Sequence, residues 1–281
     1  MKAILVPVEE SDLLESMLTT ALRVGERFGS YIEGQYDRPS LVESWGPEGL
    51  GSAAVMESLE QQDQERALRA RELFKQFMDG REVPDGGEAA AREGPSASWF
   101  EDPSPGNVMI ANRGRVFDMI VVGQPRREAV APRMITLEAA LFESGRPIMI
   151  APAQAPATLG ETVVIAWNGS TETARTMAFA MPFLAQAAKV SVIAVEEGMV
   201  PGPDAPAAAR YLARNGIQAR AHTVSAGKRP VGEVLLDQAT ELGADLLIKG
   251  AYTHSRLRQM IFGGATSHIL AKAQVPVFMA H

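Results

Sequence analysis

The stretch TVVIAWNGS, residues 162–170, decides how the chain is organised. It begins with a run of apolar, largely β-branched residues, which is typical of a strand that is covered on both faces, and it ends in a polar turn at Ser170. An equivalent stretch, AILVPVEES, occupies residues 3–11. An amphipathic segment follows each of them, at about residues 18–28 and 176–187. The order strand, polar turn, helix therefore occurs twice.

Two more pairs of stretches repeat in the same order. FDMIVVG at residues 117–123 matches ADLLIKG at 244–250, and RPIMIA at 146–151 matches VPVFMA at 275–280. Three matched strands in one order predict a tandem of two similar units, each of about 140 residues. A chain of 281 residues is also long enough for two domains at the usual size of roughly 150 residues each.

A linker rich in Pro and Ala, residues 151–160, separates the two units. We therefore predict an N-terminal domain at residues 1–152 and a C-terminal domain at residues 161–281.

Strands alternate with helices in each unit, which predicts parallel pairing through right-handed crossovers. The predicted fold class is α/β, with two tandem doubly wound five-stranded parallel sheets that carry helices on both faces. The strands expected in the second unit are 162–167, 189–195, 217–224, 245–249 and 275–279. Ligands in such sheets bind outside the carboxyl ends of the strands, where the strand order reverses, so polar residues after the first and fourth strands are the first candidates for a site.

Composition excludes several classes of function. The net charge of −7 argues against a nucleic-acid binder, because proteins of that class usually have a basic face. The chain has no cysteine, which excludes disulfides, thiolate nucleophiles and cysteine-ligated metals. No apolar run approaches the roughly 18 residues of a membrane span, and the four histidines lack metal-binding spacing. We expect a cytoplasmic protein that binds no nucleic acid, membrane or resident metal.

The segment GAYTHSRLRQMIFGGATS, residues 250–267, is the candidate binding motif. Gly250 would let the chain turn sharply and let a ligand approach the backbone. Gly263 and Gly264 would leave bare N–H groups at the start of the following helix, which is an anion site suited to phosphates. The side chains expected to add hydroxyl donors or positive charge are Thr266, Ser267, His254, Arg256 and Arg258.

These features resemble the universal stress protein family. Its nucleotide-binding members carry Gly, two residues, Gly, nine residues, Gly and then Ser or Thr after the fourth strand. Here Gly250, Thr253, Gly263 and Gly264 stand at those positions, so the spacing is kept and two of the four residue types differ. The resemblance implies a Rossmann-like fold of the adenine nucleotide alpha hydrolase type and a bound ATP or AMP, with or without Mg²⁺.

The resemblance also places adenine or ribose at the end of the first strand of the second unit. Asn168 stands where the family usually has aspartate. An amide can hydrogen-bond a ribose or an adenine, but it is a poorer ligand than a carboxylate for a hard cation, so Asn168 disfavours metal-assisted chemistry more than nucleotide binding. The residues of the predicted nucleotide site are Ala166, Trp167, Asn168, Ser170, Gly250, Thr253, His254, Arg256, Gly263, Gly264, Ala265 and Thr266.

Simpler structural interpretations exist for the same residues. The glycines can serve turns alone, Asn168 or Ser170 can cap the following helix, and Trp167 can belong to the core. In the first unit, Met134 and Ile135 stand near the positions of the glycine pair, and Glu9 and Glu10 after the first strand would repel a phosphate. We therefore expect the first unit to have lost the nucleotide site.

Three functions remain open at this stage. The first is a nucleotide-binding stress or signalling protein without strong catalysis, since the motif contains no general base and no carboxylate pair. The second is a slow ATP hydrolase, which Asn168 disfavours, and the third is an interaction protein in which both sites are dead, which Thr253 and Gly264 favour. The two units would pack as an intramolecular pseudo-dimer, and a homodimer of the whole chain is an open alternative.

Overall fold

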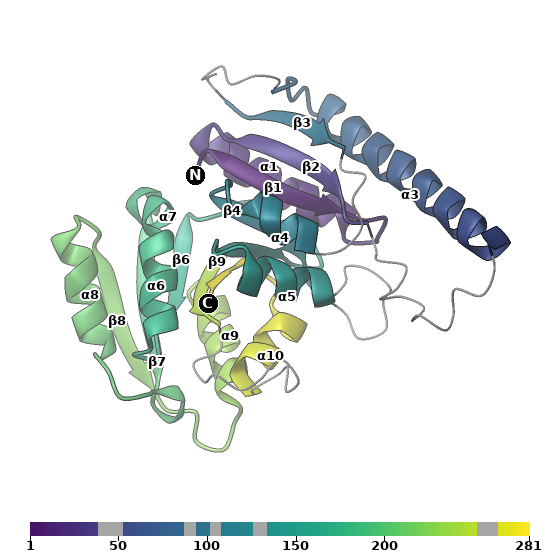
Figure 1. Cartoon of the computed structure of the whole chain (residues 1–281). Helices are drawn as coiled ribbons and strands as arrows, with labels where there is room; N and C mark the ends of the chain where they lie inside the picture. The colour runs from purple at the N-terminus through teal and green to yellow at the C-terminus, as the bar shows by residue number, and fades with distance from the viewer. Residues whose placement is uncertain (39–52, 87–93, 102–107, 126–133, 252–263) are drawn as a thin grey trace. The chain divides into compact units, whose positions relative to one another are not determined.

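The computed structural model describes residues 1–38, 53–86, 94–101, 108–125, 134–251 and 264–281 (Figure 1). The chain divides into two compact units, Met1–Arg146 and Pro147–His281. The domain limits that we placed at residues 152 and 161 stay predictions.

The first unit builds a parallel sheet in which the residues of three strands, β1 (Ala3–Val8), β2 (Tyr31–Tyr36) and β4 (Met119–Gly123), are almost all buried. Its strand order is β3-β2-β1-β4, and β1 pairs in parallel with both β2 and β4. Helix α1 ends where Gly29 adopts a left-handed φ of 60° and donates its N–H to the carbonyl of Gly25. Its described elements are β1 (Ala3–Val8), α1 (Leu14–Phe28), β2 (Tyr31–Tyr36), α3 (Ala53–Asp79), β3 (Ser96–Phe100), α4 (Val108–Gly114), β4 (Met119–Gly123) and α5 (Met134–Glu143).

The second unit follows the same plan with one more strand. Its strand order is β5-β10-β9-β6-β7-β8. Every pair in it is parallel except β5 with β10. Its described elements are β5 (Ile148–Ala151), β6 (Thr162–Ala166), α6 (Thr171–Phe179), α7 (Met181–Gln186), β7 (Lys189–Val195), the 3-10 helix η1 (Glu196–Gly198), α8 (Ala205–Arg214), β8 (Ala219–Val224), α9 (Val231–Glu241), β9 (Leu246–Gly250), α10 (Gly264–Lys272) and β10 (Val277–Ala280).

The predicted α/β class with a mostly parallel sheet is confirmed, whereas the division into two separate five-stranded sheets stays a prediction. Strand β5 ends the first sequence repeat, yet it belongs to the second compact unit, where Met149 pairs with Phe278 in antiparallel register. All residues of β5 and β10 are buried and apolar. An open edge of this kind would recruit another strand, so the pairing of β5 with β10 covers it.

The strand order of the second unit reverses between β6 and β9. From β6 the chain moves outward through α6 and α8 to β8, and it then returns through α9 to β9, which lies on the other side of β6. Right-handed crossovers place α6 and α8 on one face of the sheet and α9 and α10 on the other. Ala166, the last residue of β6, is paired in register with Lys249 of β9. A crevice between these two strand ends is where a ligand is expected.

The core of the second unit is made of the apolar strand residues that the sequence indicated. Val163, Val164 and Ile165 of β6 are fully buried. Phe183 of α7 packs edge-on against Phe278 of β10, with ring centroids 5.7 Å apart. Such contacts fix the helices on the sheet and hold the strand ends in place.

Gly250 ends β9 against the first turn of α6. A Cβ on Gly250 would lie 2.4 Å from the backbone nitrogen of Thr173 and 2.7 Å from the carbonyl carbon of Glu172. Its φ is not in the left-handed region. The absence of a side chain therefore allows helix and strand to pack closely, which is a different role from the sharp turn that the sequence suggested.

We predict that Gly250→Ala lowers the stability of the second unit. The added methyl group would meet backbone atoms that cannot rotate away, so we expect a loss of about 1–3 kcal/mol in the free energy of unfolding. Urea unfolding followed by circular dichroism measures it. Gly264→Ala is the matched control, because a Cβ there meets no heavy atom within 4 Å. Equal unfolding midpoints for the two variants would contradict the packing role of Gly250.

Candidate functional site

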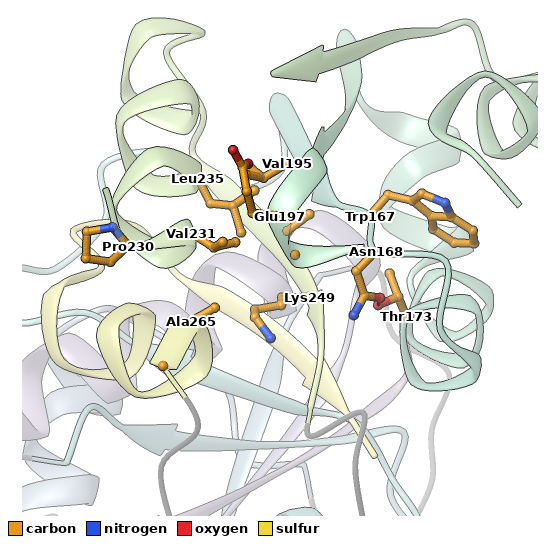
Figure 2. Close-up of a pocket in the computed structure, with 13 residues that line it drawn as sticks. Trp167, Asn168, Thr173, Val195, Glu197, Pro230, Val231, Leu235, Lys249 and Ala265 are labelled. Carbon is orange, nitrogen blue, oxygen red and sulfur yellow. Dashed lines mark hydrogen bonds between the residues drawn. The ribbon is translucent and has the colours of Figure 1, made fainter. Parts of the chain in front are cut away.

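A cavity of about 320 Å³ lies at the carboxyl ends of β6 and β9, where the strand order reverses (Figure 2). Its wall is formed by the ends of β6, β7 and β9, by η1, and by the first turns of α6, α9 and α10. The residues that line it are Ala166, Trp167, Asn168, Thr173, Val195, Glu197, Gly198, Pro230, Val231, Leu235, Lys249, Gly264 and Ala265.

Asn168 organises the turn that leaves β6. Its Oδ1 accepts hydrogen bonds from the Thr173 hydroxyl at 2.7 Å and from the Ser170 backbone N–H at 3.2 Å. Ser170 is the N-cap of α6, and its hydroxyl accepts the Thr173 N–H at 3.2 Å. The structure thus confirms Ser170 as the helix cap. The carboxamide oxygen of Asn168 is used within the turn, which fixes the edge of the cavity.

Trp167 contributes to the cavity wall while its indole ring packs elsewhere. The ring points away from Lys249 (Figure 2), and the side chain is buried. The indole N–H donates to the carbonyl of Pro203 at 2.8 Å. A ring held in this way does not offer a stacking surface to a ligand in the cavity, so the alternative interpretation of Trp167 as a core residue describes it better.

The amino-terminal ends of α9 and α10 meet at the cavity. Gly232 permits this approach, because a Cβ there would lie 2.7 Å from the carbonyl oxygen of Ala265 and 2.9 Å from the Cβ of His268. Pro230 and Val231 at the start of α9 and Gly264 and Ala265 at the start of α10 therefore line the same space. The first turn of a helix has N–H groups without intrahelical partners and carries partial positive charge, so both helices favour an anion here.

Lys249 places an ammonium group in this cavity. Its Nζ donates to the carbonyl of Gly250 at 2.8 Å and to the hydroxyl of Thr266 at 2.9 Å. Although the side chain keeps some exposure to the cavity, the surrounding protein removes most of its hydration, and this burial lowers the pKa of Lys249 to about 8. No carboxylate in the described part of the chain forms an ion pair with it. Among the described residues, the cavity therefore holds a cation without a counter-ion.

The sequence analysis does not place Lys249 among the site residues, because the pattern assigns it to the strand that precedes the glycine motif. The available signal was a charged residue at the end of an otherwise apolar run, LLIKG at residues 246–250, at the sheet edge where ligands bind. Lysine is rarely buried without a partner, so a lysine at the end of a buried strand indicates a functional group.

The wall on the α9 side is apolar. Val195 of β7 and Val231 and Leu235 of α9 form most of it, and they lie opposite Asn168 and Thr173 in Figure 2. A cavity with one apolar wall and one cationic, donor-rich wall suits a ligand that combines a flat apolar ring with an anionic group.

Glu197 joins two of the segments that form the cavity wall. Its carboxylate accepts the N–H of Ala226 at 2.7 Å, the hydroxyl of Ser225 at 2.7 Å and the N–H of Gly227 at 2.9 Å. These hydrogen bonds, led by that from the Ala226 N–H, lower the pKa of Glu197 to about 2. The carboxylate points away from Lys249 (Figure 2) and ties η1 to the loop that leads into α9.

We predict that the loop at residues 225–227 is held only while Glu197 is ionised. Because the pKa is depressed in the folded protein, the contribution is present above the usual glutamate pKa of about 4.5 and is lost as the pH falls through about 2. The amide proton shifts of Ala226 and Gly227, followed by NMR, should titrate near pH 2. Glu197→Gln should give the low-pH shifts at neutral pH, whereas Glu196→Gln, at the adjacent exposed residue, should not.

The residues of the predicted site separate into three groups. Ala166, Trp167, Asn168, Gly264 and Ala265 line the cavity. Ser170, Gly250 and Thr266 adjoin it without lining it, as helix cap, packing glycine and hydrogen-bond acceptor for Lys249. Thr253, His254, Arg256 and Gly263 lie outside the described residues. Their roles stay predictions.

Two further findings bear on the site and its surroundings. The described residues contain no group of three or more His, Asp or Glu side chains that could hold a metal ion. Within the same part of the chain, every helix is too short or too polar to cross a membrane.

In the first unit, the charged groups at the start of α5, the counterpart of α10, have the opposite sign to Lys249. Helix α5 begins at Met134, as α10 begins at Gly264. The third residue of α5, Thr136, donates from its hydroxyl toward the buried carboxylates of Glu9 at 3.3 Å and Asp37. Buried carboxylates at this edge would repel a phosphate, which agrees with the expectation that this unit has lost the nucleotide site.

The comparisons with known proteins agree first on the class of fold, which is that of a Rossmann-like α/β protein. Across almost all of its length the chain has the fold of a universal stress protein from Archaeoglobus fulgidus DSM 4304 (TM-score 0.69, 18% identity, covering 99% of this chain and 95% of that one). It is also similar to a functionally unknown protein from Pseudomonas aeruginosa PAO1 (TM-score 0.57, 14% identity, covering 100% and 92%).

The family follows from the sequence model. Residues 161–281 match the model of the Universal stress protein family. The second repeat therefore belongs to the universal stress protein family, as the resemblance predicted, within a chain whose whole fold is that of a universal stress protein. No curated protein matches the sequence. The structure of a universal stress protein from Archaeoglobus fulgidus in complex with dAMP also matches, at 21% identity over 43% of this chain and 97% of that chain. Its TM-score is 0.34, so this likeness supports no conclusion about a ligand.

Proposed function

We propose that the cavity of the second unit binds an adenine nucleotide of the ATP or AMP type, and that the protein acts in stress response or signalling through this bound state. The observation that carries the proposal is the meeting of the starts of α9 and α10 with the Lys249 ammonium at one cavity. Three sources of positive potential without a described counter-ion favour an anionic ligand. Membership of the second repeat in the universal stress protein family supports a nucleotide as that anion.

The two walls of the cavity suggest how the nucleotide lies. The base would contact the apolar side chains of Val195, Val231 and Leu235. The phosphate would lie at the start of α10, where Gly264 has no side chain to obstruct it. Asn168 would border the ribose between them. The volume of about 320 Å³ is at the lower end of the range for small-molecule sites, which favours a compact ligand such as AMP.

Strong catalysis is not part of the proposal. A hydrolase would need a ligand for Mg²⁺ and a group that positions water. Asn168 offers an amide in place of a carboxylate, and its oxygen already accepts two hydrogen bonds. The carboxylate of Glu197 is bound to the loop at residues 225–227. A weak ATPase and an interaction protein without a ligand remain as outcomes of the test. Cytoplasmic location and homodimerisation, which we expected from the sequence, also stay predictions.

We predict that AMP and ATP bind the wild-type protein with micromolar affinity and that Gly264→Asp binds them at least about tenfold more weakly. A carboxylate in the first turn of α10 should not harm folding, because helix starts favour negative charge and no atom lies within 4 Å of the added Cβ. It would, however, repel the phosphate. Calorimetric titration with and without Mg²⁺ measures the affinities. Gly264→Asn has nearly the same shape without the charge and should bind more tightly than Gly264→Asp.

The titration separates the three functions. If the wild-type protein shows neither binding heat nor a thermal shift with AMP or ATP, the nucleotide-binding proposal is rejected and an interaction protein is favoured. Mg²⁺-dependent phosphate release that disappears in Gly264→Asp would favour the hydrolase. Equal affinities of Gly264→Asp and Gly264→Asn would move the phosphate away from the start of α10.

A further inference from the structure

We infer that Lys249 is the counter-ion of the ligand's phosphate, and that through this residue the second unit takes up a proton when it binds. The inference rests on the proposed function, because it names the group that makes the site select a phosphorylated nucleotide over its nucleoside. It concerns a residue outside the glycine motif, one that the resemblance did not point to.

The position of the ammonium supports the inference. Thr266 is in the first turn of α10, so its hydrogen bond with Nζ at 2.9 Å places the ammonium beside the positive end of that helix. Both described partners of Nζ, the Thr266 hydroxyl and the Gly250 carbonyl, are neutral acceptors. A lysine in this position repels the helix end and is not compensated by it. A phosphate between the two would be attracted by both.

The charges around β9 do not relieve this repulsion. The charged or titratable groups on the described elements around β9 include Glu172 and Arg175 of α6, Glu197 of η1, Glu233 of α9, His268 of α10 and His281 after β10. Glu197 binds the loop at residues 225–227, and Glu233 pairs with Arg229 at 2.8 Å. The Arg175 guanidinium donates to the backbone carbonyl of His281. None of these carboxylates forms an ion pair with Lys249 in the part of the chain that is described.

A proton balance follows from this geometry. Burial lowers the pKa of Lys249 to about 8 in the free protein, so the amine is partly deprotonated between pH 7 and 9. A phosphate beside it stabilises the charged form and raises the pKa again. The phosphate itself is fully ionised in this range, since its second pKa is about 6. Binding at pH 8 should therefore take up about half a proton, and the affinity should fall about tenfold between pH 7 and pH 9.

The experiment compares AMP with adenosine, which lacks the phosphate, by calorimetry at pH 7, 8 and 9. Titrations at pH 8 in two buffers with different ionisation enthalpies give the number of protons taken up. Lys249→Met keeps the length of the side chain and removes the charge, while Lys249→Arg keeps a charge that does not titrate in this range. Lys272→Met makes the same change at an exposed residue in the last turn of α10 and is the matched control. Thermal unfolding checks that each variant is folded.

For the wild-type protein and Lys272→Met we expect the tenfold fall in AMP affinity and the uptake of about half a proton at pH 8. For Lys249→Met we expect an AMP affinity at pH 7 that is at least tenfold lower than that of the wild-type protein. This affinity should not change between pH 7 and pH 9, and binding should take up no proton. Lys249→Arg should bind AMP with no dependence on pH, and adenosine should bind equally to all four proteins.

Two results would overturn the inference while the proposed function stands: AMP binding by Lys249→Met as tight as by the wild-type protein, or AMP binding by the wild-type protein without proton uptake. A different result would overturn the proposed function. If neither adenosine nor AMP binds the wild-type protein, titration with pyrophosphate decides the rest. If pyrophosphate binds the wild-type protein but not Lys249→Met, the contact between Lys249 and an anion is retained and the nucleoside part of the proposed ligand is rejected. If pyrophosphate does not bind the wild-type protein, both proposals are rejected.

Discussion

The second unit depends on a contact that leaves no room for a side chain, between Gly250 at the end of β9 and the first turn of α6. This approach brings the end of β9 next to the turn that leaves β6, so that Lys249 and Asn168 come to line one cavity. Gly232 does the same between α9 and α10. Two close approaches of backbone segments thus assemble the site, and they determine where its charged and polar groups lie.

A threonine at the same position of both repeats contacts groups of opposite charge. Thr136 and Thr266 are each the third residue of the helix that follows the fourth strand of their repeat. In the first unit the hydroxyl donates to carboxylates, and in the second it accepts from an ammonium. A hydroxyl can do either, because it is both donor and acceptor. The two repeats could therefore acquire opposite charges at this place without a change in the backbone that holds the threonine.

Much of the fold could be predicted from the sequence, because buried parallel strands give apolar runs and the repeat places them twice in order. The region of the site followed from the position where such sheets bind ligands. The roles of single residues were less predictable. The sequence predicts a turn and ligand role for Gly250, because its close packing against Thr173 depends on a helix far from it in sequence. Lys249 was missed, since only the tertiary structure shows that its ammonium has no carboxylate partner among the described residues.

Because β5 pairs with β10, the compact second unit begins earlier in the chain than the segment that the family model matches. The segment that the family model covers begins at residue 161, but the strand that shields β10 lies before it, at Ile148–Ala151. A fragment cut at the start of the family match would contain every wall of the cavity and would still expose an apolar strand, Val277–Ala280, along one edge. Such a fragment would tend to self-associate or precipitate through this edge. Excision of the second repeat therefore has to begin before β5, inside what the sequence marks as the first repeat.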